Sequence, residues 1–211
     1  MKLYSYFRSS ASFRVRIALA LKGLDFEVIP INLRSGEQKT SDYRSINPQG
    51  FVPALKDNGQ VIAQSLAIME YLDEAYPNTP PLLPQDIGQR ATVRALVQLI
   101  ACEIHPLNNL RVLNYLTDTL GLSEKVMTDW YAHWVNEGFI VLEKELQKHM
   151  GFYAYGNTPT LVDCFLVPQV FNAKRINMDL SIYPNITRVV DNCMKLDAFR
   201  QASPANQVDA I

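Results

Sequence analysis

The segment Ser9-Ser10-Ala11-Ser12 brings several hydroxyl groups together where a predicted helix begins. The free amides of a helix start and a hydroxyl donor both favour a bound anion. A cysteine-type thiol has a pKa of about 8.5 and reacts as the thiolate, so a donor that lowers this pKa by about one or two units would activate it. Ser9 is the candidate donor and Ser10 the close alternative. The other interpretation of these serines is ordinary helix capping.

Two further segments could hold parts of an extended anionic ligand. Ser65 lies at a second predicted helix start, where free amides can bind a carboxylate and the Gln64 side chain can add a donor. Val52-Pro53 opens a predicted strand, and a proline there leaves the Val52 backbone available to a ligand. Taken alone, each segment also fits a purely structural role, as a cap or as an ordinary strand-start proline.

The elements that would position these residues follow the order βαβ and then ββα. Gly23 ends the first helix, and Asn58-Gly59 is a strong hairpin signal. This order is thioredoxin-like, and redox proteins of that class keep a Cys-x-x-Cys motif where this chain has its serines. Because the segment holds no cysteine, we expect a site for a thiol supplied from outside. The expected strands are 2–6, 26–31, 52–56 and 60–63, and the expected helices are 13–22 and the segment after Ser65.

A proline-rich stretch at 78–84 divides the chain, because each proline removes a backbone donor and restricts the residue before it. We expect a thioredoxin-like domain over 1–79 and an all-helical domain over 86–211. Thr160 and Asp163 have the spacing of a capping box, which favours a structural rather than a catalytic role for Asp163. The expected helical segments of the second domain are 86–119, 123–150, 161–174 and 184–196.

The bulk composition narrows the classes of partner. The 20 Lys and Arg nearly balance the 21 Asp and Glu, which gives no electrostatic case for nucleic acid or an anionic membrane. Three cysteines without a short Cys-x-x-Cys spacing argue against a disulfide framework and a zinc site, and no His-Glu-x-x-His pattern supports metal-dependent hydrolysis. No signal peptide or membrane-spanning run is evident. Together with the cysteine and histidine patterns, this leads us to expect a cytoplasmic protein that works without a metal.

Several motifs together resemble the zeta glutathione transferases, and the resemblance covers essentially the whole chain. In the first domain the similar runs begin at Tyr6-Phe7-Arg8-Ser9, Asn47-Pro48-Gln49-Gly50 and Gln64-Ser65-Leu66. In the helical domain they begin at His105-Pro106-Leu107-Asn108-Asn109 and Asp163-Cys164-Phe165. The resemblance implies the glutathione transferase fold, glutathione as the cofactor and a homodimer.

The same resemblance implies roles for individual residues around glutathione. Ser9 would orient and activate the sulfur, with Ser10 and Ala11 beside it. Val52, before a cis-Pro53, would pair with the cysteinyl backbone. The remaining contacts would come from Gln64 and Ser65 at the γ-glutamyl end, Gln38 at the glycyl end, and His105 and Asn109 from the helical domain.

Three arginines are candidates for binding an acidic substrate, because guanidinium groups grip carboxylates. Arg8 directly precedes the serines, and Arg175 ends a predicted helix, where complementing the helix terminus is its ordinary role. The resemblance implies that Arg8 and Arg175 face a diketo-acid substrate, with Arg111 as a helper. The family commonly reads Ser-Ser-Cys-Ser, whereas this chain has Ala11 in place of the cysteine, so a cysteine-based mechanism has no support here.

The function implied by the resemblance is glutathione-dependent cis-trans isomerisation of maleylacetoacetate to fumarylacetoacetate, as in aromatic amino acid catabolism. The run Asn109-Leu110-Arg111 mildly favours this substrate over the shorter maleylpyruvate. The alternatives are a maleylpyruvate isomerase, a glutathione-binding scaffold without turnover, and a general conjugating or dehalogenating transferase.

Overall fold

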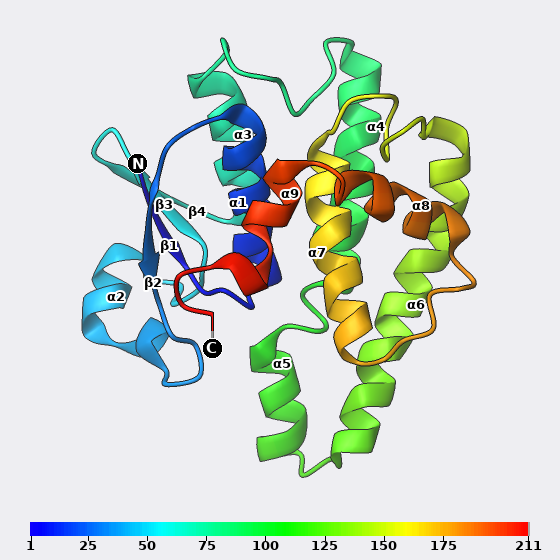
Figure 1. The fold of residues 1–211 in the computed structure, drawn as a ribbon. Coiled ribbons are helices and arrows are strands. Elements are labelled where there is room, and N and C mark those ends of the chain that lie inside the picture. The colour runs from blue at the N-terminus through cyan, green and yellow to red at the C-terminus, as the bar shows by residue number, and fades with distance from the viewer. Residues whose placement is uncertain (211) are drawn as a thin grey trace. The chain divides into compact units, whose positions relative to one another are not determined.

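A computed structural model describes residues 1–210 of the chain, which folds into two compact units. Unit 1 is Met1–Leu83 together with the chain from Met194 onward, and unit 2 is Pro84–Cys193. Figure 1 shows the sheet in unit 1 and the long helices in unit 2.

Unit 1 is built on a four-stranded sheet in the order β2-β1-β3-β4. β1 and β2 are parallel, whereas β3 is antiparallel to both β1 and β4, so the thioredoxin-like βαβ-ββα order is confirmed. The strands are β1 (Lys2–Ser5), β2 (Glu27–Pro30), β3 (Ala54–Asp57) and β4 (Gln60–Ala63). The helices are α1 (Ser10–Lys22), the 3-10 turn Glu37–Lys39, α2 (Ser41–Ile46) and α3 (Ser65–Ala75).

Helices cover both faces of this sheet. Leu3 of β1 is fully buried, while its neighbour Tyr4 points to the opposite face and meets Tyr43 of α2 with ring centroids 5.9 Å apart. In Figure 1, α1 and α3 lie on one side of the sheet and α2 on the other. Helix α1 packs against α3, and every residue from Ser12 to Leu19 is buried.

The local signals that end elements act as predicted. Gly23 adopts φ +63°, the left-handed conformation that closes a helix, and it ends α1. Asn58 and Gly59 have φ values of +46° and +82°, as a tight hairpin between β3 and β4 requires.

The carboxyl-terminal segment departs from the expected boundary of the second domain. Helix α9 (Asp197–Ala202) and the 3-10 turn Pro204–Asn206 belong to unit 1, where α9 packs against α1. Phe199 is fully buried there, and Arg16 donates to the Ala202 carbonyl over 2.9 Å. A short amphipathic helix has the same pattern whichever core it joins, so the sequence carried no sign of this return.

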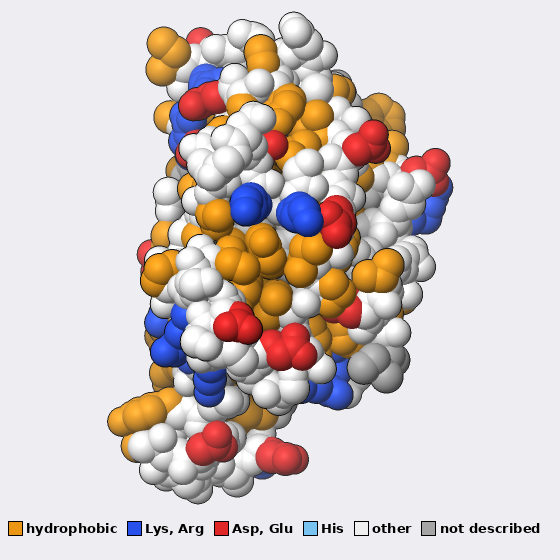
Figure 2. Space-filling view, turned by 90° about the vertical axis from the view of Figure 1, so that its left-hand side faces the viewer, with side chains coloured by type: hydrophobic (Ala, Val, Ile, Leu, Met, Phe, Trp, Pro, Cys, Tyr) orange, Lys and Arg blue, Asp and Glu red, His pale blue; other side chains and the backbone are white. Residues whose placement is uncertain are grey.

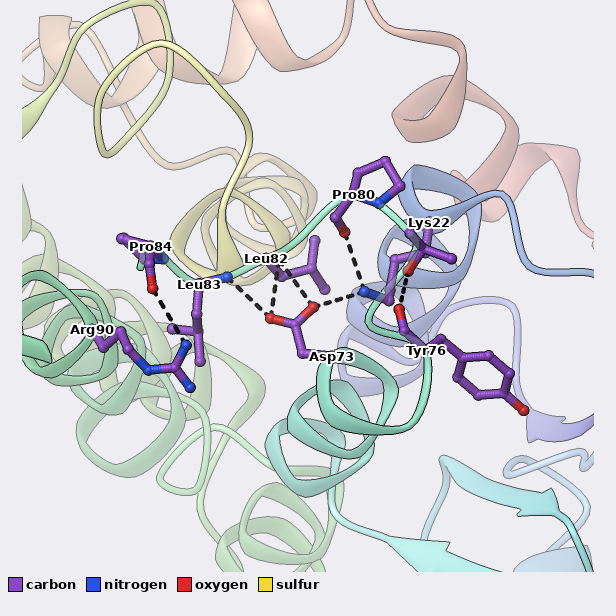
Figure 3. A network of polar contacts seen from close by, with 9 residues as sticks. Lys22, Asp73, Tyr76, Pro80, Leu82, Leu83, Pro84 and Arg90 are labelled. Atoms are coloured by element: carbon purple, nitrogen blue, oxygen red, sulfur yellow. Dashed lines mark hydrogen bonds and ion pairs between the residues drawn. The ribbon is translucent and has the colours of Figure 1, made fainter. Parts of the chain in front are cut away.

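The proline-rich stretch is fastened to unit 1 by a buried ion pair, shown in Figure 3. Lys22 Nζ lies 2.8 Å from Asp73 Oδ1, and it also donates to the Pro80 carbonyl over 3.1 Å. The Asp73 carboxylate accepts the backbone amides of Leu82 at 3.0 Å and Leu83 at 3.1 Å. These contacts explain why unit 1 extends to Leu83, beyond the expected end at residue 79.

Unit 2 is helical, as predicted, but its first long helix is interrupted. The chain leaves regular helix between His105 and Asn109, because Pro106 has no amide to continue the ladder. The elements are α4 (Ile87–Gln98), the π-helix Leu99–Ile104, α5 (Leu110–Asn114), the π-helix Tyr115–Thr119, α6 (Glu124–His149), α7 (Leu161–Arg175) and α8 (Pro184–Cys193).

The capping box at the start of α7 is confirmed. The fully buried Asp163 carboxylate accepts the backbone amides of Thr160 and Ala154, each over 2.8 Å. Burial raises the pKa of Asp163, and the bonds from Ala154 and Thr160 act in the opposite direction. These contacts support the structural interpretation of Asp163.

Charged side chains of both signs are interspersed with hydrophobic ones over the face shown in Figure 2. This mixture agrees with a formal net charge of -1. Within residues 1–210, none of the helices is long and apolar enough to cross a bilayer.

Candidate active site

Four connecting segments of unit 1 leave the sheet at one edge, and the strand register shows why. Ser5 at the end of β1 pairs with Pro30 at the end of the parallel β2. Ala54 at the start of β3 pairs with Tyr4 and with Ala63 at the end of β4. The segments that follow β1, β2 and β4 and the segment that precedes β3 therefore share this edge, which we call the site edge. They carry Arg8 and Ser9, Gln38, Gln64 and Ser65, and Val52 and Pro53 respectively.

Ser9 is the N-cap of α1. Its Oγ accepts the backbone amide of Ser12 over 3.2 Å, and the side chain stays partly exposed. A serine hydroxyl carries one proton and two acceptor lone pairs, so this capping bond leaves the proton for another acceptor. Capping and thiol activation are thus compatible at Ser9. Ser10 opens the helix and is buried, and Ala11 follows it half-buried.

Gln64 and Ser65 form the start of α3. Gln64 has a positive φ of 72°, and its side-chain Nε2 donates to Gln49 Oε1 over 2.9 Å. Ser65 is buried, and its Oγ accepts a hydrogen bond from Arg14 Nη1 over 3.3 Å. Because the oxygen is used as an acceptor, the Ser65 proton can be donated to a ligand carboxylate beside the helix-start amides.

Arg14 was not among the predicted site residues. Arg14 is only 2% exposed, and its side chain reaches from helix α1 to the start of α3. One sequence feature could have indicated Arg14: it lies inside a predicted helix whose neighbouring positions are apolar and buried. A buried arginine needs polar partners, so such a residue is a candidate for contacts with a polar site.

The bond between Val52 and Pro53 is cis, as the family resemblance implies. The segment before it is anchored at the Phe51 carbonyl, which accepts hydrogen bonds from the Tyr43 hydroxyl at 2.6 Å and from the Asn47 side-chain Nδ2 at 2.8 Å. Burial is the main cause that raises the pKa of Tyr43 to about 12. Tyr43 is a second supporting residue that the sequence did not reveal.

Gln38 lies on the 3-10 turn after β2 and is buried. Its side-chain nitrogen donates to the Leu33 carbonyl over 3.4 Å. A Cβ at Gly50 would come within 2.9 Å of the Gln38 backbone oxygen, so the turn of Gln38 and the segment before Val52 pack closely. Only glycine fits position 50, which also has φ +65°.

The remaining predicted residues belong to unit 2, and the structure describes them within that unit. Asn109 is the N-cap of α5, where its Oδ1 accepts the Arg111 amide over 3.1 Å. Arg111 is exposed on α5, and Arg175 is exposed at the end of α7. His105 is half-buried and directly follows the π-helix Leu99–Ile104.

Residues 1–74 match the family model for the glutathione S-transferase, N-terminal domain. The chain is 47% identical to a maleylacetoacetate isomerase of Pseudomonas aeruginosa, over 99% of this chain and 98% of that one. It is also similar to the solved holo structure of a bacterial maleyl pyruvate isomerase described as a zeta-class glutathione S-transferase, with 46% identity, a TM-score of 0.97 and 100% of both chains covered.

A third similar protein is a maleylacetoacetate isomerase from Anaeromyxobacter dehalogenans, whose structure holds dicarboxyethyl glutathione and citrate in the active site. Identity to that chain is 38%, with a TM-score of 0.89 over 100% of this chain and 97% of that one. This chain belongs to the zeta class of the glutathione S-transferase family.

Proposed function

We propose that this protein is a glutathione-dependent cis-trans isomerase that converts maleylacetoacetate to fumarylacetoacetate. The observation that carries the proposal is the gathering of Ser9, Val52 and Gln64-Ser65 at the site edge. The Pseudomonas relative bears the name of this isomerase, and the Anaeromyxobacter structure holds glutathione joined to a group with two carboxylates. The proposed substrate, a diketo acid, is also acidic.

The polar groups of the site edge fit an extended tripeptide that carries a carboxylate at each end. The Ser65 hydroxyl and the amides at the start of α3 suit the γ-glutamyl carboxylate, with Gln64 beside them. The Val52 backbone, before the first ladder residue Ala54, suits the cysteinyl unit. We assign the glycyl end to Gln38, and we propose His105 and Asn109 as further glutathione-binding residues.

We assign the activation of the thiol to Ser9. Its hydroxyl proton is left for a sulfur acceptor by the bond from Ser12, and its side chain is more exposed than that of Ser10. Ser10 and Ala11 add the first amides of α1, whose dipole favours an anion at this end. Since Ala11 replaces the family's cysteine, the reacting sulfur has to be that of glutathione.

Bound glutathione supplies a thiolate that adds to the cis double bond, moves the π electrons onto the conjugated carbonyl oxygen, and leaves after rotation about the new single bond. Arg8 and Arg175 hold the substrate carboxylates and stabilise the negative charge that develops on oxygen. Arg111 assists them. The electron pair returns to the double bond when the carbon–sulfur bond breaks, so neither a metal nor a redox partner enters the balance.

The test compares Ser9→Ala with Ser123→Ala in a maleylacetoacetate assay with and without glutathione. Ser123 is a matched control, because it also caps a helix, accepting the Val126 amide in unit 2. Either change should cost about 1 kcal/mol of stability through the lost cap. Only Ser9→Ala should lose about 10- to 100-fold in activity at neutral pH, the effect of raising a thiol pKa by one to two units.

Activity should vanish when glutathione is omitted. Isomerisation that persists without glutathione, or a Ser9→Ala variant as active as Ser123→Ala, would contradict the proposal. Glutathione binding without any isomerisation would instead identify a scaffold, and turnover confined to α-haloacids a dehalogenating transferase.

Maleylpyruvate is the second candidate substrate, because the zeta-class maleyl pyruvate isomerase covers the full chain at 46% identity. The ratio of kcat/KM for the two substrates decides between them, and a comparable or higher value for maleylpyruvate would overturn maleylacetoacetate as the named substrate. We further propose a cytoplasmic homodimer, which size-exclusion chromatography with light scattering and localisation of the tagged protein would test.

A further inference from the structure

The backbone of Phe7, directly before Arg8 and Ser9, is held on both sides by residues distant in the sequence. Its amide donates to Asp209 Oδ2 over 2.9 Å, across 202 positions of the chain. Its carbonyl accepts from Arg16 Nη2 over 3.0 Å. The residue that enters the site edge is therefore fixed at its amide and at its carbonyl.

Arg16 organises this arrangement from inside the protein. Its side chain is 1% exposed, and its guanidinium donates four hydrogen bonds, to the carbonyls of Ala202, Tyr6 and Phe7 and to the Ser5 hydroxyl, over 2.9 to 3.4 Å. A planar guanidinium sets the relative positions of its acceptors, which the rotating ammonium of lysine does not. Burial lowers the pKa of Arg16 to about 10, and the charge of Asp209 acts in the opposite direction.

The carboxyl-terminal segment supplies partners at two points of this network. The carbonyl of Ala202, at the end of α9, accepts a hydrogen bond from Arg16, and the carboxylate of Asp209 accepts one from the Phe7 amide. Ala210 packs on the apolar cluster that contains Tyr6 and Phe7. The same turn continues into the site, because the Ser9 amide donates to the Tyr6 carbonyl over 3.0 Å.

We propose that Asp209, acting with Arg16, is a positioning residue for Ser9 and Arg8. The carboxyl-terminal segment thereby holds the loop between β1 and α1, which carries Ser9, in the position that thiol activation requires. The proposal rests on the proposed function, because it concerns the Ser9 hydroxyl as donor to glutathione. A hydroxyl displaced by about 1 Å from its acceptor no longer forms a good hydrogen bond, so loosening Phe7 weakens the donor without removing it.

The test uses three variants and three measurements. Asp209→Ala removes the acceptor of the Phe7 amide, Asp209→Asn keeps an oxygen acceptor but removes the charge, and Arg200→Ala is the control. Arg200 lies on the same segment, and its guanidinium donates to the Met194 and Lys195 carbonyls and to the Asp197 carboxylate. The measurements are hydrogen exchange of the peptide that contains Phe7, the thiolate fraction of bound glutathione by ultraviolet absorbance at neutral pH, and the Kd of S-methylglutathione, which has no thiol.

Asp209→Ala should speed amide exchange at Phe7 and lower the thiolate fraction about three- to ten-fold, the effect of a thiol pKa raised by half to one unit. Its Kd for S-methylglutathione should stay within about two-fold of wild type, because Gln64 and Ser65 are untouched. Asp209→Asn should change the thiolate fraction in the same direction by less, and it keeps the test valid if the alanine variant does not fold. Arg200→Ala should match wild type.

Three results would overturn the proposal. An unchanged thiolate fraction in both Asp209 variants refutes the positioning role alone. An equal loss of S-methylglutathione affinity shows a general structural role instead. A wild-type protein that binds neither glutathione nor S-methylglutathione refutes the proposed function, and with it the positioning role that rests on that function.

Discussion

Replacement of Asp163 by alanine should be among the most destabilising single changes in unit 2. The carboxylate accepts two buried amides, those of Ala154 and Thr160, each over 2.8 Å, and also the Thr160 hydroxyl over 3.1 Å. A buried amide left without an acceptor costs about 1–3 kcal/mol, so the two amides cost about 2–6 kcal/mol. Burial of the carboxylate, which raises its pKa, offsets part of that loss. We expect a net destabilisation of about 3 kcal/mol.

Asp86→Ala is the matched control, because Asp86 caps α4 by accepting the Gln89 amide over 2.8 Å but is exposed. An exposed cap of this kind is worth about 1 kcal/mol. The two tryptophans, Trp130 and Trp134, both lie on α6, so their fluorescence in a urea titration reports on unit 2. Each kcal/mol should also lower Tm by about 2–4 °C in a chain of this size.

The reasoning fails if Asp163→Ala shifts the urea midpoint no further than Asp86→Ala does. A different failure would be a stable Asp163→Ala protein whose kcat has dropped, since that result assigns Asp163 to the chemistry. The expected outcome is a less stable protein whose folded fraction keeps the wild-type kcat.

Three further predictions concern the site and its supporting residues. Arg175→Ala should raise KM for the acidic substrate about ten-fold with a smaller effect on kcat, as expected for a lost charged contact. The control Lys174→Ala, at the neighbouring exposed residue, should leave both constants unchanged. Unchanged kinetics in Arg175→Ala would remove that arginine from the substrate site. Ser65→Ala and Arg14→Met should each weaken glutathione binding. Because the two side chains are hydrogen-bonded, isothermal titration calorimetry of the double variant should show a loss of binding free energy smaller than the sum of the two single losses. Full additivity would argue against one shared contact. Burial raises the pKa of Tyr43 from 10.0 to about 12, so its contribution to stability is complete below the pKa of the unfolded state and is lost as the pH rises through the pKa of the folded state. The urea midpoint should therefore fall less steeply between about pH 9 and about pH 12 in Tyr43→Phe than in the wild type. An equal fall in both proteins would contradict this prediction.

Features with a local cause could be predicted from the sequence. The hairpin at Asn58-Gly59 and the helix end at Gly23 depend on residues that tolerate positive φ, and both occur as expected. The capping box at Thr160 and Asp163 likewise needs only two side chains three positions apart. In each case the physical cause lies within a few residues of its effect.

Features that depend on spacing over a longer stretch were predicted less well. The expected helix over 86–119 is interrupted near Pro106 and contains two π-helical turns. Helical periodicity continues on both sides of such a break, because an apolar face can resume after a change of direction. The periodicity therefore indicated helices without revealing that there was more than one.

The candidate site divides along the same line. Ser9, Gln64 and Ser65 lie at helix starts and Val52 lies just before a strand. A ligand can reach the backbone at such positions, and the sequence reveals them. Arg14 lies inside a helix with apolar spacing and Tyr43 inside the mostly polar helix α2, so neither pattern marks its residue as a support of the site.

The contact between Phe7 and Asp209 is the extreme case, because no local rule connects residues 202 positions apart. A buried guanidinium, however, requires acceptors, and helix α1 carries two buried arginines. Such a helix implies that backbone carbonyls are turned toward it from elsewhere in the fold. Two of the four acceptors of Arg16 are the Tyr6 and Phe7 carbonyls, in the segment that leads to Ser9. The hydrogen bonds that a buried guanidinium needs therefore also fix the segment that the proposed chemistry requires in one position.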